Sequence, residues 1–257
     1  MGPPVEYDIR KDPEAIIREF VPKKVAVLTG AGISVASGIS PFRGPGGLWE
    51  KYDPEEVANI ENFKKNPRKS WIMLKEVLDV VEKAQPNSAH LSLAEMEKKG
   101  FVSSVITQNV DGLHQRAGNK SVIEYHGNTT RMVCLSCFAK FSSRETDFST
   151  LPPYCPNCGG VLKPDAVFFG EPIPRAALLK AHTEAQQCRV MLVVGTSGMV
   201  HPAAGLPLIA KKNGARVIEV NPVRSHLTAS VTDVFLKGKA EEILPVIEKG
   251  LSDYIKG

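Results

Sequence analysis

The chain has 257 residues, 42% of them apolar, which is enough to build a sizeable hydrophobic core and excludes disorder as its main character. Its 32 basic and 28 acidic side chains leave a net charge of +4, an imbalance too small to require a nucleic-acid partner. Five cysteines in a chain of this length do not fit a small disulfide-stapled secreted scaffold, and they predict a cytoplasmic protein with free thiols.

The first predicted element is a short helix with Asp12 as its N-cap and Pro13 in its first turn, and it ends before Pro22. The polar N-terminal segment lacks the apolar stretch of a secretory signal. The longest apolar runs, such as Val190 to Val194, are strand-sized and too short to cross a bilayer as a helix. We therefore expect no membrane association.

Strands and helices then alternate along the chain. The apolar runs predict strands at 25–28, 102–106, 190–194 and 217–220, and the helical patterns cover 88–98, 203–212 and a last helix from about 240, with Pro245 in or near its first turn. Each strand ends in small polar residues. This order predicts an α/β fold, a Rossmann-like doubly wound parallel sheet covered on both faces, with ligands at the carboxyl ends of the strands.

Two stretches interrupt the alternation, and we interpret both as insertions. Residues 42–85 are rich in Gly, Pro and charge before they turn helical, and they predict a loop followed by a small helical module. Residues 130–162 hold four of the five cysteines and predict a zinc-ribbon module. The Rossmann-like domain would then comprise residues 1–41, 86–129 and 163–257.

The cysteine cluster consists of two Cys-x-x-Cys pairs, Cys134 with Cys137 and Cys155 with Cys158, separated by seventeen residues. Each pair can present two thiolates, and together they predict a closed four-thiolate zinc site with a structural role. The alternative is two disulfides or four unrelated thiols. Cys188 is interpreted as a small core residue.

A glycine-rich turn, Gly30-Ala31-Gly32, follows the first strand and is expected to open a helix whose N-terminus could hold a diphosphate. The fingerprint of hydride-transfer enzymes requires a third glycine where this chain has Val35, so the turn favours a nucleotide site without redox use. A glycine turn needed only for close packing is the alternative.

Longer motifs resemble the sirtuin family, in the order found there, over about residues 13–250. They are residues 30–39, Phe42-Arg43-Gly44, residues 107–114, residues 124–128, residues 163–171, Gly195-Thr196-Ser197 and Val220-Asn221-Pro222, and the cysteine pairs lie where the family has them. The resemblance, to the short prokaryotic or archaeal form, implies an NAD-dependent protein-lysine deacetylase. Its acyl group passes from lysine to ADP-ribose, with NAD as co-substrate and zinc as a structural metal.

The resemblance also implies catalytic roles for His126 and Asn109. An unperturbed histidine pKa of about 6.5 suits a base that removes a ribose hydroxyl proton. His126 is the candidate, Asn109 would help to orient the ribose, and His114 is interpreted as structural. A structural histidine in a turn is the alternative for His126.

The resemblance further implies two binding sets. The NAD-binding set is Gly30, Ala31, Gly32, Val35, Phe42, Arg43, Gln108, Asn109, Val110, Asp111, Thr196, Ser197, Asn221 and Ala240. Within this set, Val110 and Asp111 would line the nicotinamide pocket and Ala240 would lie near adenine. Thr196, Ser197 and Asn221 would contact phosphate or the adenosine ribose. The substrate peptide would add as a strand between two strand-like segments, Val167-Phe168-Phe169 and Gly198-Met199-Val200. Helix caps and ordinary core strands are the alternatives.

The sequence departs from the family pattern at Ser40-Pro41, where the family has Pro-Asp or Pro-Thr, and this bears on closure of the loop over NAD. Members that remove succinyl or malonyl groups carry Tyr and Arg where this chain has Leu74 and Val77, counted from Trp71. An apolar pocket predicts acetyl or other neutral acyl groups, because a buried carboxylate without a partner is costly.

The expected partner is an acetyl-lysine protein or peptide, with chromatin-associated proteins as one candidate class. Mono-ADP-ribosyl transfer to protein is the rival enzyme activity, because it would use the same NAD pocket. A zinc-ribbon protein that binds nucleic acid is the non-enzymatic alternative. The absence of a dense basic stretch argues against direct nucleic-acid binding.

Overall fold

The computed structural model describes residues 4–21, 24–41 and 46–256. Its larger sheet has seven strands in the order β1-β10-β9-β8-β2-β3-β4, and every neighbouring pair is parallel. The strands are β1 (Val5–Tyr7), β2 (Val25–Thr29), β3 (Val102–Thr107), β4 (Val122–Glu124), β8 (Val190–Val194), β9 (Arg216–Asn221) and β10 (Val234–Lys237). The predicted parallel sheet is confirmed. The strands β1, β4 and β10 were not predicted, because they are only three or four residues long.

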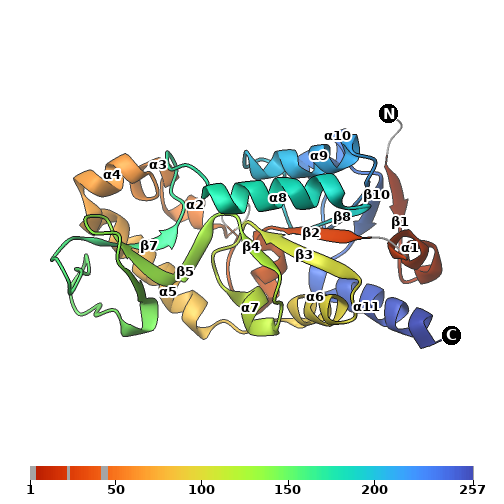
Figure 1. Ribbon diagram of the computed structural model, residues 1–257, viewed down its shortest axis with the longest axis horizontal. Coiled ribbons are helices and arrows are strands. Elements are labelled where there is room, and N and C mark those ends of the chain that lie inside the picture. Colours follow the sequence, from red (N-terminus) through yellow and green to blue (C-terminus); the bar gives the residue numbers. More distant parts are fainter. Residues whose placement is uncertain (1–3, 22–23, 42–45, 257) are drawn as a thin grey trace.

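Helices cover both faces of this sheet (Figure 1). One face carries α1 (Pro13–Phe20), α6 (Ser88–Lys98) and α11 (Ala240–Lys256), and the other carries α8 (Arg175–Gln187), α9 (Leu206–Lys212) and α10 (His226–Ser230). Alternate residues of each buried strand serve the two faces. In β8, Leu192 packs toward α1, α6 and α11, whereas Met191 and Val193 pack toward α8 and α9. Within the described residues, no helix combines the length and apolar character that crossing a membrane requires.

Several predicted helices differ in detail from the structure. The glycine-rich turn opens a 3-10 helix, η1 (Ala31–Ser37), instead of an α-helix, and the helix predicted at 203–212 begins as a second 3-10 turn, η3 (Ala203–Gly205). Pro245 lies in the second turn of α11, beyond its predicted place. Proline has no N–H for the carbonyl of Glu241 four residues earlier, and Ser88 Oγ donates to that oxygen at 2.8 Å instead.

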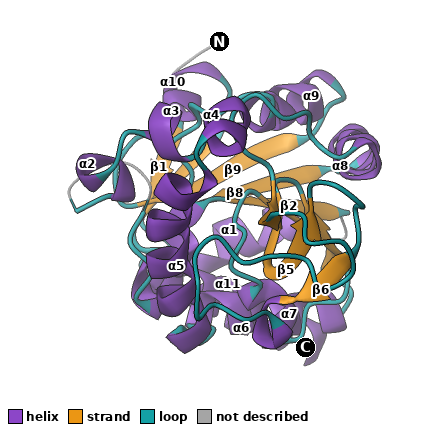
Figure 2. Ribbon diagram, turned by 90° about the vertical axis from the view of Figure 1, so that its left-hand side faces the viewer, coloured by secondary structure: helices purple, strands orange, loops and turns teal. Residues whose placement is uncertain are grey.

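The two stretches interpreted as insertions lie side by side at one end of the molecule (Figure 2). The first contains α2 (Leu48–Lys51), α3 (Pro54–Val57), α4 (Ile60–Lys65) and α5 (Pro67–Lys83). The second holds a three-stranded antiparallel sheet in the order β6-β5-β7, formed by β5 (Gly127–Cys134), β6 (Lys140–Ser142) and β7 (Leu162–Ala166), with a 3-10 turn, η2 (Ser143–Glu145). This small sheet extends a few residues beyond 130–162 at both ends. The division of the chain into domains stays a prediction.

The two insertions share one hydrophobic core. Trp71, Phe63 and Met73 of the helices pack with Cys134 and Cys155 of the cysteine-rich segment. The fully buried Trp71 also donates from Nε1 to the backbone oxygen of Leu162 at 2.9 Å. The helical insertion and the cysteine-rich insertion therefore form a single packed unit.

The strand order reverses at β2, because the chain continues from β2 to β3 on one side and later returns through β8 on the other. Ligands of open parallel sheets bind at such a point, beyond the carboxyl ends of the strands. The short helix α7 (Leu113–Ala117) follows β3 near this edge. The topology therefore directs attention to the loops after β2, β3 and β8.

Candidate active site

A cavity of about 1120 Å³ opens at this edge, between the large sheet and the unit formed by the two insertions. Its volume is slightly above the range of about 300–1,000 Å³ that is usual for small-molecule sites. The lining includes most of the residues that the sequence analysis selected: Gly30, Ala31, Gly32, Val35, Gln108, Asn109, Val110, His126, Val167, Phe168, Phe169, Thr196, Ser197, Val200, Asn221 and Ala240. The structure thus gathers residues from both ends of the chain into one site.

Phe42 and Arg43 lie outside the described residues. Asp111, Gly198 and Met199 do not line this cavity. Asp111 is buried behind the loop after β3, where its carboxylate accepts hydrogen bonds from Ser34 Oγ at 2.8 Å and from the backbone N–H of Leu113 at 2.9 Å. Its predicted place in the nicotinamide pocket stays a prediction.

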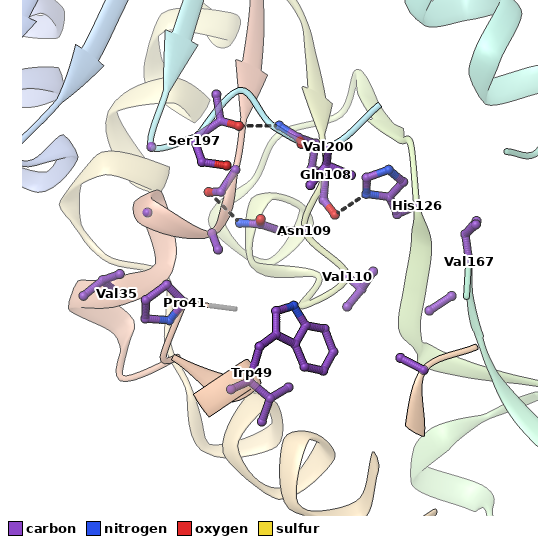
Figure 3. A pocket seen from close by; sticks show the side chains of 18 of the residues that line it. Val35, Pro41, Trp49, Gln108, Asn109, Val110, His126, Val167, Ser197 and Val200 are labelled. Carbon is purple, nitrogen blue, oxygen red and sulfur yellow. Dashed lines mark hydrogen bonds between the residues drawn. The ribbon is translucent and has the colours of Figure 1, made fainter. Parts of the chain in front are cut away.

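His126 lies between β4 and β5, with Gln108 beside it on the same wall of the cavity (Figure 3). Its Nδ1 is 3.0 Å from the backbone oxygen of Gln108. A carbonyl oxygen only accepts, so Nδ1 carries the hydrogen and Nε2 keeps its lone pair. Burial lowers the pKa of His126, which the bond to Gln108 partly opposes. The neutral ring can therefore act as a base at neutral pH.

Asn109 follows β3 and is fixed by two hydrogen bonds. Its amide donates to the backbone oxygen of Gly30 and to Ser34 Oγ, both at 3.1 Å. The neighbouring Gln108 donates from Nε2 to Thr196 Oγ1 at 3.0 Å. These bonds join the loops after β2, β3 and β8 into one rigid wall of the cavity.

The glycines of the β2 loop are required by packing as well as by the cavity. The N–H of Gly32 donates to the oxygen of Gly195 at 2.8 Å. A Cβ on Gly30 would come within 2.8 Å of the same oxygen, and a Cβ on Gly32 within 2.7 Å of it. The glycines thus allow close packing, but packing is not their only place in the structure, because the loop also lines the cavity. Any side chain at these positions would force the two loops apart.

The predicted peptide-binding segments are not regular strands. Val167 and Phe168 follow β7 in extended loop, Phe169 forms an isolated parallel bridge with Asn59, and residues 198–200 lie in a loop. The N–H of Val167 donates to the oxygen of His126 at 2.8 Å. The helical insertion therefore occupies one edge of this segment, which explains why it does not pair as a core strand.

The four predicted metal ligands converge. The Sγ atoms of Cys134, Cys137, Cys155 and Cys158 all lie within 4.8 Å of one another. Cys134 and Cys158 are 3.5 Å apart and Cys137 and Cys155 are 3.7 Å apart, close to the ~3.8 Å expected for a tetrahedron with Zn–S bonds of about 2.3 Å. All five cysteines are described and none forms a disulfide. The donor set fits zinc, and the disulfide alternative is wrong.

A family model described as the Sir2 family matches residues 30–202, which is more than half of the chain. The chain belongs to the Sir2 family. The sirtuin resemblance of the sequence motifs is therefore confirmed. The matched range contains both cysteine pairs, His126 and the loops after β2, β3 and β8.

This Sir2-family chain is 49% identical over 219 residues to a Pyrobaculum aerophilum protein named NAD-dependent protein deacylase 2, covering 85% of the chain and 87% of the relative. A solved structure of a Sir2 homologue in complex with NAD matches with a TM-score of 0.91 and 39% identity, covering 99% of the chain and 98% of that structure. A structure of Sir2 with a p53 peptide and NAD matches with a TM-score of 0.85 and 36% identity, covering 92% and 98%.

The Sir2-family site also has a buried polar layer, of which the motifs indicated His114 but not His90. His90 and His114 have ring centroids 4.9 Å apart, and His114 Nε2 lies 3.0 Å from Thr29 Oγ1. Desolvation lowers the pKa of His90 to about 3, with a smaller contribution from His114, and lowers that of His114 to about 4. Both rings are therefore neutral in the folded protein at neutral pH.

We expect the free energy of unfolding to fall by roughly 2 kcal/mol between pH 7 and pH 5.5. The unfolded histidines bind protons near their ordinary pKa of about 6.5, whereas folded His90 and His114 do not, so unfolding takes up protons and acid favours it. Burial raises the pKa of Asp111, which contributes with the opposite sign. Urea unfolding at both pH values with saturating zinc measures the loss. His90→Gln should remove about half of it, and equal stability at both pH values would contradict the explanation.

Proposed function

We propose that this protein is an NAD-dependent protein-lysine deacetylase that acts on neutral acyl groups. The observation that carries the proposal is the geometry of His126, whose Nδ1 is committed to Gln108 while Nε2 is left as a proton acceptor beside a large cavity at the strand ends. The named activity of the relative and the NAD complex of a structural neighbour support the same assignment.

In the proposed reaction, the carbonyl oxygen of the acyl-lysine attacks the anomeric carbon of the NAD ribose and the bond to nicotinamide breaks. His126 removes a proton from a ribose hydroxyl, and that oxygen then attacks the acyl carbon, so that the acyl group is transferred to the ribose. One water is consumed, and the products are nicotinamide, O-acyl-ADP-ribose and lysine. Asn109, held by Gly30 and Ser34, would orient the ribose. The apolar walls would exclude water from the cationic sugar.

The loops of the large sheet would hold NAD, and the four cysteines would hold zinc away from the reacting atoms. The acyl-lysine would enter beside Phe169, whose ring lies 6.5 Å from that of Trp49. The segment around Val167 and the loop around Val200 both line the cavity, and we propose that they offer main-chain groups to a peptide. Such recognition depends little on the peptide sequence, so acetylated proteins in general, chromatin-associated ones included, are the proposed partners. The proposed compartment is the cytoplasm.

Mass spectrometry of the products formed from NAD and an acetyl-lysine peptide tests the function. We expect free lysine peptide, nicotinamide and O-acetyl-ADP-ribose in equal amounts. Protein labelled with ADP-ribose, without deacylation, would instead support mono-ADP-ribosyl transfer. Salt-dependent DNA binding without NAD binding would support the nucleic-acid alternative.

We expect a succinyl-lysine peptide to have a kcat/KM at least about tenfold below that of the acetyl peptide, because the α5 residues that line the cavity, Met73, Leu74 and Val77, carry no charge to pair with its carboxylate. Leu74 and Val77 line the cavity from α5. Val77→Arg combined with Leu74→Tyr should raise succinyl turnover and lower acetyl turnover. Ile72→Arg, on the exposed face of the same helix, is the matched control and should change neither. Equal succinyl and acetyl turnover by the unmodified protein would refute this preference.

A further inference from the structure

Glu219 is a fully buried acidic residue in the strand β9. Its carboxylate accepts three hydrogen bonds, from Asn221 Nδ2 at 3.0 Å, from Thr228 Oγ1 at 2.8 Å and from Thr232 Oγ1 at 2.7 Å. In the part of the chain that the structure describes, no ion pair joins it to a cationic side chain. Burying a carboxylate without a cation is costly, so the position requires a physical explanation.

Asn221 lies two residues further along β9, so its side chain is on the same face of the sheet as Glu219. Its amide donates one hydrogen to Glu219 Oε1 at 3.0 Å and the other to the backbone oxygen of Thr196 at 2.9 Å. An amide nitrogen has two hydrogens, and both are used. Among the described residues no donor faces Asn221 Oδ1, and Asn221 lines the cavity. The oxygen is therefore the group that Asn221 offers to a ligand.

This orientation distinguishes two kinds of ligand group. An amide oxygen accepts hydrogen bonds, and the oxygens of an ionised phosphate also only accept, so the two repel each other. A ribose hydroxyl can donate to the amide oxygen. The negative charge of Glu219 behind the amide adds to the rejection of a phosphate.

We propose that Glu219 is a positioning residue that fixes Asn221 with its oxygen toward the cavity, so that this position takes a ribose hydroxyl of the nucleotide and rejects a phosphate. The inference rests on the proposed use of NAD and deepens it. Of the two contacts that the family resemblance implies for Asn221, it favours the adenosine ribose over a phosphate, and it assigns the cause of that choice to Glu219. A nucleotide with a 2′-phosphate on that ribose would then be disfavoured.

A simpler role for Glu219 is to anchor α10 through Thr228 and Thr232. That role would affect stability but not the choice of ligand. Thr232→Val separates the two roles, because it removes one hydrogen bond to Glu219 and leaves the bond to Asn221 intact. Glu219→Gln removes the charge and also offers an N–H, which allows Asn221 to turn its own N–H toward the cavity.

The test measures the dissociation constants of ADP-ribose and of its 2′-phosphorylated form by titration calorimetry, with the full chain and both variants. The unmodified protein should prefer ADP-ribose at least about tenfold. Glu219→Gln should weaken ADP-ribose binding about tenfold and reduce the preference by a similar factor. Thr232→Val should lower the melting temperature and keep both constants within about twofold.

Unchanged constants in Glu219→Gln, or an equal change in Thr232→Val, would overturn the inference while the proposed function stands. Failure of the unmodified protein to bind ADP-ribose would overturn both. A second test changes the ligand instead of the protein, so it does not require a variant to fold. An ADP-ribose analogue without hydroxyls on the adenosine ribose should bind the unmodified protein about tenfold more weakly, and equal binding would also overturn the inference.

Discussion

The substitution His126→Ala is expected to lower kcat for deacylation at least about a thousandfold, because it removes the only proton acceptor that we assign to the ribose hydroxyl. The side chain is half-buried and bonded only through Nδ1, so its loss should change stability by less than about 1 kcal/mol. Steady-state kinetics with NAD and an acetyl-lysine peptide measure the effect. Zinc content and the far-UV spectrum should match those of the unmodified protein.

His182→Ala is the matched control, since His182 lies on α8 and does not line the cavity. It should retain full activity. The pH profile gives a second check. Because burial lowers the pKa of His126, the rate of the unmodified protein should fall at a lower pH than it would for a base with the ordinary histidine pKa of about 6.5, as the ring takes up a proton. Substantial deacylation by His126→Ala would exclude the base assignment.

Removal of zinc is expected to unfold the unit formed by the two insertions and to abolish activity. Structural zinc sites of small modules contribute on the order of 10 kcal/mol of apparent folding free energy at neutral pH. Cys134 is fully buried in the core that includes Trp71 and Phe63, so Cys134→Ser should disrupt the packing of the helices as well as the metal site. Metal analysis measures the loss of zinc, near-UV spectra measure the loss of tertiary structure, and tryptophan fluorescence measures the change in packing around Trp71.

Cys188→Ser provides the control for a buried cysteine outside the cluster. Its Sγ contacts the backbone oxygen of Ala185 at 3.4 Å, and the substitution should cost about 1–2 kcal/mol without loss of zinc. Treatment of the unmodified protein with a chelator should reproduce the Cys134→Ser phenotype, and added zinc should reverse the effect of the chelator. Loss of activity in a zinc-free protein whose near-UV spectrum is unchanged would show that the metal has a catalytic role instead.

The sequence predicted best where local chemistry decides the structure. The strand Val190–Val194 was placed at its observed bounds because five apolar residues stand between polar ones. Asp12 was recognised as a helix cap and accepts the N–H of Ala15. The regular spacing of Cys134, Cys137, Cys155 and Cys158 predicted their convergence.

Prediction failed where partners come from distant parts of the chain. A single glutamate in an apolar strand gives no signal of burial, because the hydroxyl donors to Glu219 come from α10 and the turn after it. The segment at Phe169 is strand-like in sequence, but its pairing with Asn59 of the helical insertion is not visible in local patterns.

The shared core of the two insertions has a consequence for how specificity can change. Met73 and Leu74 belong to that core and also line the cavity, whereas the loops proposed to hold NAD belong to the large sheet. Acyl preference and nucleotide affinity should therefore vary independently under mutation. A mutation in the acyl wall should also change the zinc affinity, because the wall and the cysteine cluster share one core.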